Sequence, residues 1–126
     1  MTWLAIAVGG AIGSMARHAV NHIVHTHWLS TRFPAGTVAV NLLGCFIIGL
    51  LAGLVASERI AFRFYSREFV FVGLLGGFTT FSTFGLDTLL LTRAPSAGQA
   101  ALNVAVHVVG GLTAVWVGYA LGLSQA

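Results

Sequence analysis

A run of glycine and polar residues interrupts a hydrophobic stretch between Gly73 and Asp87, whose sequence is GLLGGFTTFSTFGLD. The adjacent Gly76 and Gly77 are poor continuations of a helix, because glycine loses the most backbone freedom on ordering. Hydroxyl side chains follow that can take up the backbone hydrogen bonds freed by a broken helix: Thr79, Thr80, Ser82 and Thr83. Non-helical backbone at membrane depth persists only where protein covers it or where it lines a wet cavity. The stretch therefore predicts a broken transmembrane helix, an arrangement that marks ion and substrate sites.

Two aromatic rings and one carboxylate follow the expected break at a spacing of three residues. Phe81 and Phe84 share a face if the chain is helical again there, and Asp87 continues the same face. An acidic side chain in or near the membrane is a functional candidate. The alternatives are packing or lipid contact for the two phenylalanines, and a hydrated carboxylate at a helix end for Asp87.

Three polar side chains stand out in the other hydrophobic stretches. Asn41 is either an interhelical hydrogen-bond partner or a pore-lining donor, since an amide offers two N–H groups to an anion. Arg17 is either a cation near a pore mouth or an arginine that reaches the membrane surface. His107 ends a stripe with Gln99 and Asn103 at a spacing of four, and it either titrates and donates or is a hydrogen-bonded structural histidine.

A second group of histidines lies near the end of the first hydrophobic stretch. His18, His22 and His25 recur at helical spacing, which could hold a metal ion. The favoured interpretation is polar positions at the membrane interface, because no acidic or cysteine ligand is near them in the sequence. Both interpretations stay open at this stage.

The composition shows what must position these residues. Of 126 residues, 57% are hydrophobic and 7% are charged, which is typical of a membrane protein and not of a soluble domain. We expect an all-α membrane protein with a single transmembrane domain over residues 1–126. Each of its hydrophobic stretches exceeds the roughly 20 residues that cross the hydrocarbon core. The four predicted helices cover about 3–24, 34–57, 68–92 and 95–123, and the third is broken.

The charged residues flank these helices and indicate how the chain inserts. Arg59, Arg63 and Arg67 lie on one expected side of the membrane, and Arg32 and Arg93 lie on the other. This difference is too small for the positive-inside rule to fix an orientation. Insertion both ways, and hence an antiparallel homodimer, is permitted. The net positive charge of the chain comes from arginines at the membrane interface, and it does not indicate nucleic-acid binding.

Four motifs resemble the Fluc fluoride channels, also called the CrcB family. They are GGFTTFSTF at 76–84, NLLGCFIIG at 41–49, GAIGSMAR at 10–17 and HVVGG at 107–111. The resemblance implies a channel, not an enzyme, that exports fluoride passively across the bacterial inner membrane to limit its toxicity. It further implies a dual-topology antiparallel homodimer with two pores and a central structural sodium ion.

The resemblance also implies roles for individual residues. Backbone carbonyls of Gly76 and Thr79 match the sodium ligands, and Arg17 matches a vestibule charge. The predicted pore and fluoride residues are Asn41, Phe81, Ser82, Thr83, Phe84 and His107. Fluoride is small and tightly hydrated, so a pore must offer donors in place of water, and phenylalanine ring edges carry partial positive charge.

The sequence departs from the family pattern at two places. Gly85 and Asp87 stand where the family usually has a serine and a glutamate. In the last helix, Gly111 and Val115 occupy positions of the usual hydroxyls, and Thr113 is out of step with them. These departures concern the hydroxyl lining contributed by the last helix and leave the third-helix motif intact.

Two other functions remain as alternatives. A small dual-topology multidrug/proton antiporter needs a carboxylate in its first helix, where this chain has Arg17 and no acid. A non-transporting membrane scaffold would explain the glycines but would leave the TTFSTF motif without a purpose. An enzyme is disfavoured because the histidines have no nucleophile and acid arranged around them.

Overall fold

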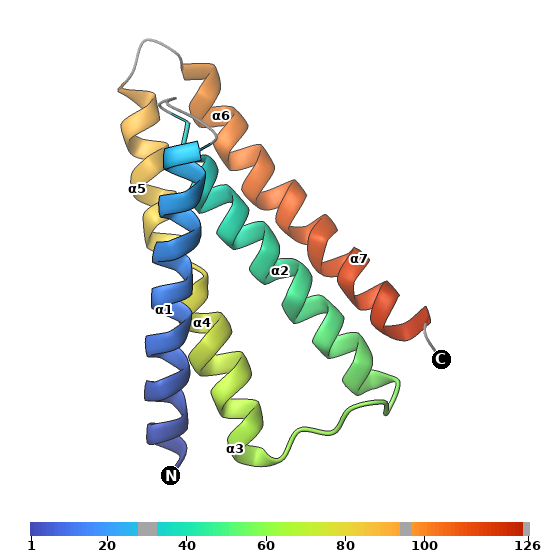
Figure 1. The fold of residues 1–126 in the computed structure, drawn as a ribbon. Coiled ribbons are helices and arrows are strands. Elements are labelled where there is room, and N and C mark those ends of the chain that lie inside the picture. Colours follow the sequence, from blue (N-terminus) through green and yellow to red (C-terminus); the bar gives the residue numbers. More distant parts are fainter. Residues whose placement is uncertain (28–32, 94–96, 125–126) are drawn as a thin grey trace.

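The computed structural model describes residues 1–27, 33–93 and 97–124 (Figure 1). All regular structure in these residues is helical, so the expectation of an all-α chain is confirmed. The elements are α1 (Thr2–His27), α2 (Ala35–Ala56), α3 (Phe64–Arg67), the π-helical segment η1 (Glu68–Leu75), α4 (Gly76–Phe78), α5 (Phe81–Thr92), α6 (Ala97–Ala105), the π-helical segment η2 (Val106–Gly110) and α7 (Gly111–Ser124).

Three helical stretches of the described residues are long and apolar enough to cross a membrane: Ala35–Ala56, Phe64–Thr92 and Gly98–Ser124. They correspond to the predicted helices 34–57, 68–92 and 95–123, although residues 95 and 96 lie outside the described residues. The stretch Phe64–Thr92 begins four residues earlier than predicted, because α3 extends it. The chain is therefore a multi-pass membrane protein.

The first helix is longer than predicted but less apolar than the other three. α1 has 26 residues, which at 1.5 Å per residue is long enough to span. It is not among the three apolar stretches, because Arg17 and the histidines lower its mean hydropathy. A fourth transmembrane span therefore stays a prediction.

Glycines bring α2 and α7, which run side by side in Figure 1, into backbone contact. A methyl group on Gly118 would overlap the Phe46 carbonyl and lie 2.8 Å from the Leu50 nitrogen. On the opposite helix, one on Gly49 would overlap the Val115 carbonyl. Small residues at these positions therefore let the two helices pack backbone to backbone.

A second set of glycine contacts joins α1 to the stretch Phe64–Thr92. A methyl group on Gly9 would lie 2.5 Å from the Phe69 carbonyl oxygen, and one on Gly77 would lie 2.6 Å from that of Gly10. Gly13 is buried against the backbone of the same segment. The absence of side chains lets α1 lie directly on η1 and α4, which positions the break described next.

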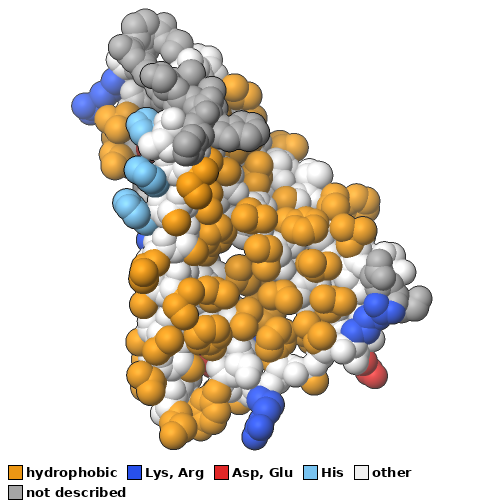
Figure 2. Space-filling model, in the orientation of Figure 1, with side chains coloured by type: hydrophobic (Ala, Val, Ile, Leu, Met, Phe, Trp, Pro, Cys, Tyr) orange, Lys and Arg blue, Asp and Glu red, His pale blue; other side chains and the backbone are white. Residues whose placement is uncertain are grey.

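Hydrophobic side chains cover the middle of the face in Figure 2, and arginines lie toward its ends. Large apolar groups are exposed on the separate chain, among them Trp3, Met15, Leu112 and Trp116. An apolar surface of this extent suits contact with lipid or with another protein surface. Histidine side chains gather along the outer side of α1 in the same view.

Candidate functional site

The helical stretch Phe64–Thr92 is broken between α4 and α5, as the sequence predicts. Thr79 (φ −85°, ψ 160°) and Thr80 (φ −153°, ψ 114°) are both extended. The break comes two residues after the expected glycine pair, which is helical. Gly77 permits the close approach of α1, whereas Thr80 starts the next helix by accepting a hydrogen bond from the Thr83 N–H.

The amide of Asn41 on α2 replaces the backbone hydrogen bonds that Thr80 loses at the break. The Thr80 N–H donates to Asn41 Oδ1 at 2.8 Å, and Asn41 Nδ2 donates to the Thr80 carbonyl at 3.1 Å. One N–H of Asn41 has no partner among these hydrogen bonds, since the amide carries two. Asn41 therefore holds the break and still has a donor to offer.

Two side chains of α1, one of them charged, donate hydrogen bonds to backbone carbonyls at the break. Arg17 Nη1 donates to the Thr79 carbonyl at 3.3 Å, and Ser14 Oγ donates to the Gly77 carbonyl at 3.5 Å. Arg17 is half-buried, so its charge stays at the break and does not extend to the end of the helix. This position argues against an arginine that reaches the membrane surface, whereas a role of Arg17 near a pore mouth stays a prediction.

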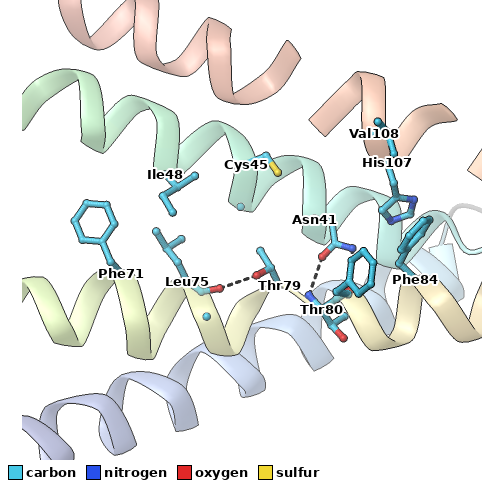
Figure 3. Close-up of a pocket in the computed structure, with 13 residues that line it drawn as sticks. Asn41, Cys45, Ile48, Phe71, Leu75, Thr79, Thr80, Phe84, His107 and Val108 are labelled. Carbon is cyan, nitrogen blue, oxygen red and sulfur yellow. Dashed lines mark hydrogen bonds between the residues drawn. The ribbon is translucent and has the colours of Figure 1, made fainter. Parts of the chain in front are cut away.

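A cavity of about 380 Å³ opens beside the break, between α2, η1, α5 and η2 (Figure 3). It brings together four of the predicted pore residues, namely Asn41, Phe81, Phe84 and His107, with both predicted sodium ligands, Gly76 and Thr79. The remaining lining residues are Gly44, Cys45, Ile48, Phe71, Leu75, Thr80 and Val108. The motifs at 41–49, 76–84 and 107–111 therefore meet at one place.

Three rings form a row along one side of this cavity. The Phe81 and Phe84 centroids are 5.4 Å apart, and the Phe84 and His107 centroids are 4.5 Å apart. Figure 3 shows Phe84 and His107 side by side. Phe81 is 83% exposed, so its ring has a free face on the separate chain.

The predicted hydroxyl residues cluster at the start of α5 but do not line the cavity. Thr80 Oγ1 lies 3.3 Å from Ser82 Oγ and 3.0 Å from Thr83 Oγ1. Thr80 is the member of this cluster that reaches the cavity, and the sequence interpretation gave it no pore role. Its position as a threonine before a helix is an N-cap signal that could have identified it.

Asp87 lies apart from this cavity. Its Oδ2 accepts a hydrogen bond from Thr37 Oγ1 at 2.9 Å, and both residues line a second cavity of about 240 Å³. Asn21 and His25 line the same second cavity. The face shared by Phe81, Phe84 and Asp87 in the sequence therefore divides between two cavities.

The oxygen atoms at the break suit a hard cation better than any side-chain cluster does. Thr80 N–H is taken by Asn41, so no backbone N–H outside the helices of the described chain donates to the Gly76 carbonyl. The Thr79 carbonyl is also directed out of the helix, although Arg17 shares it. Carbonyl oxygens are the ligand type that hard cations prefer, so these two residues fit a sodium ion. The described residues contain no group of three His, Cys, Asp or Glu side chains placed for a metal.

The residues of the last helix that replace the family's hydroxyls do not restore a polar lining. The Thr113 hydroxyl is exposed and donates to the Val109 carbonyl at 2.7 Å. A methyl group on Gly111 would meet Cys45 Sγ at 3.5 Å, so that position is closely packed. On this side of the cavity the polar group is His107.

Comparison with known proteins identifies the family of this chain. Residues 4–119 match the family model described as CrcB-like protein, Camphor Resistance (CrcB). The chain is 46% identical over 121 residues to "Fluoride-specific ion channel FluC" of Methylobacillus flagellatus, which covers 94% of this chain and 91% of that protein. It is 48% identical over 126 residues to the protein of the same name from Opitutus terrae, covering 98% and 95%. The chain belongs to the CrcB family.

Proposed function

We propose that this chain forms a fluoride-selective channel that lets fluoride leave the cell passively across the bacterial inner membrane. The carrying observation is that one cavity beside the break joins Asn41, Phe81, Phe84 and His107. Relatives that share 43–48% of its residues over nearly the whole chain are named as fluoride-specific ion channels. α1 has no carboxylate that could exchange protons for a cationic substrate, so an antiporter is not supported.

The groups around the cavity can replace the water around a small anion. Asn41 keeps one N–H free after bonding Thr80, and the edges of Phe81 and Phe84 carry partial positive charge. Ser82 and Thr83 add hydroxyl donors where α5 begins. Arg17 adds a positive potential at the break. Donors fixed by packing favour fluoride, because a larger halide would fit them poorly.

Purified protein in liposomes should release fluoride and retain chloride, as measured with ion-selective electrodes. Replacing Phe81 or Phe84 by isoleucine should reduce fluoride release by about tenfold or more, because the aliphatic side chain has no positively polarised edge. Phe64→Ile is the matched control, since Phe64 is exposed on α3 and lies outside the cavity.

Fluoride release at the wild-type rate from both cavity variants would remove the pore assignment. Equal release of chloride and fluoride by the wild-type protein would instead contradict the selectivity. Gel filtration of each variant shows whether a loss of transport merely reflects a loss of assembly.

We propose further that two copies associate in opposite orientations, with two pores and one central sodium ion. Phe81 is 83% exposed although it lines the cavity, so a second copy of the chain would complete the wall. The nearly equal arginine counts on the two sides permit both insertions. The carbonyls of Gly76 and Thr79 from both copies would hold the sodium, which would add positive potential between the pores.

A well-resolved structure of the reconstituted protein tests this assembly. We expect an antiparallel pair with density for one cation on its two-fold axis, coordinated by the Gly76 and Thr79 carbonyls. A pair in parallel orientation, a single copy or an asymmetric centre without a cation would contradict the proposal.

A further inference from the structure

Two histidines on the outer side of α1 belong to neither cavity. His18 and His22 are both exposed, and Figure 2 shows histidine side chains in a column along this helix. Their ring centroids are 6.4 Å apart and their planes differ by 18°, so the two rings are nearly parallel and one turn apart. His25, the next histidine, lines the second cavity, whereas His18 and His22 line neither. The pair is therefore a separate feature of α1.

The ring nitrogens of this pair are free to bind a ligand. In the described parts of the chain, the hydrogen bonds that use a histidine ring involve His107 and neither His18 nor His22. The ion pair of the described residues, between Arg67 and Glu68, does not include them either. A neutral imidazole carries one nitrogen lone pair, so the two side chains offer two nitrogen ligands on one surface.

The helix holds these two ligands on one face. α1 is continuous from Thr2 to His27, and residues four apart are neighbours on a helix surface. Two histidines at this spacing are how a helix presents two ligands to zinc in a metalloprotease motif. Each bond from zinc to an imidazole nitrogen measures about 2.0–2.1 Å. Because both rings are exposed, side-chain rotation alone can bring the two nitrogens to this distance from one ion.

The pair lies toward the end of the membrane-spanning region and not at its centre. A methyl group on Gly36 would overlap Asn21 Oδ1 and lie 3.2 Å from Asn21 Cα, so Asn21 is level with the first turn of α2. Since α2 is an apolar span, its first turn marks one edge of the hydrocarbon layer. His22 follows Asn21 and lies at that edge, and His18 is about 6 Å farther in. A metal ion can therefore reach the pair from the water at this surface.

The chemistry of the two ligands selects a transition metal. Imidazole suits zinc, copper and nickel, whereas magnesium and calcium prefer carboxylate and carbonyl oxygens. The described residues hold no group of three His, Cys, Asp or Glu side chains that could close the site, so water completes the coordination. At such a nitrogen site copper(II) binds most tightly, and zinc and nickel bind less tightly. The site thus differs in chemistry from the carbonyl oxygens proposed to hold sodium.

We propose that His18 and His22 form a two-nitrogen site for one divalent transition-metal ion, copper or zinc, on the outer face of α1 near the membrane surface. The site is independent of the proposed fluoride channel, because neither residue lines the cavity beside the break. An ion that binds the folded helix and not the unfolded chain stabilises the fold. This ion would tie two consecutive turns of α1 together.

Isothermal titration with zinc tests the proposal on the purified full chain, after removal of any histidine affinity tag. We expect one ion per chain in the wild type. His18→Gln and His22→Gln should each weaken binding by about tenfold or more, because a single imidazole replaces a chelating pair. His25→Gln is the matched control and should bind as tightly as the wild type, since His25 lines the second cavity. All three side chains are exposed, so circular dichroism of the metal-free variants should match the wild type.

A wild-type protein that binds no zinc would overturn the inference. Zinc binding that persists unchanged in both His18→Gln and His22→Gln would do the same. Binding that His25→Gln weakens as much as His18→Gln does would place the ion elsewhere on α1 and would also contradict the proposed pair.

Pulsed electron paramagnetic resonance of bound copper(II) counts the ligands directly. The measurement uses the Cys45→Ser background, which removes the one thiol of the chain. With one equivalent of copper we expect modulation from two imidazole rings, and from one ring at most after His22→Gln. An excess of magnesium should leave the spectrum unchanged, because magnesium prefers oxygen ligands. Modulation from fewer than two rings in the background protein, or from two rings in both His18→Gln and His22→Gln, would contradict the proposal.

Discussion

Replacing Asn41 by leucine is expected to abolish fluoride release and to lower the free energy of unfolding by about 2 kcal/mol or more. Asn41 satisfies both the N–H and the carbonyl of Thr80, at 2.8 and 3.1 Å. Each buried backbone group left without a partner costs about 1–3 kcal/mol. Denaturation of the protein in detergent measures the stability, and the liposome assay measures the transport.

Asn41→Asp separates the two roles of this residue. The carboxylate keeps an acceptor for the Thr80 N–H but places a second oxygen against the Thr80 carbonyl and a negative charge beside the cavity. We expect it to lose transport by anion repulsion while it keeps more stability than the leucine variant. An Asn41→Leu protein as stable as the wild type would show that Asn41 does not hold the break.

The second large effect is expected from one methyl group on α7. Gly118→Ala should lower the free energy of unfolding by about 3 kcal/mol, the upper part of the range for overpacking. The added carbon would overlap the Phe46 carbonyl and lie 2.8 Å from the Leu50 nitrogen. These are backbone atoms of α2 and cannot rotate away, so the two helices must separate. Thermal and denaturant unfolding in detergent measure the loss.

Gly85→Ala on α5 is the matched control for this substitution. Among the described residues nothing lies within 4 Å of a methyl group at Gly85, so we expect Gly85→Ala to stabilise the helix, by up to about 1 kcal/mol. If both variants lose the same stability, close packing of α2 on α7 is not what requires Gly118.

Hydropathy alone located the three apolar spans to within four residues, because burial in lipid demands long uninterrupted apolar runs. The break was predicted at the glycine pair and lies two residues later. Gly77 is needed for contact with α1, and Thr80 provides the N-cap of α5. The pairing of Asp87 with Thr37 could not be predicted, because the two residues are 50 positions apart in the chain and meet only in three dimensions.

The break at Thr79 and Thr80 is held from two directions, which affects how it can move. Arg17 and Ser14 of α1 bind the carbonyls of Thr79 and Gly77, while Asn41 of α2 binds Thr80. α4 and α5 can therefore rotate about the break only if these hydrogen bonds with α1 and α2 are lost. We expect the break to act as a stiff bend between the two half-helices and not as a hinge.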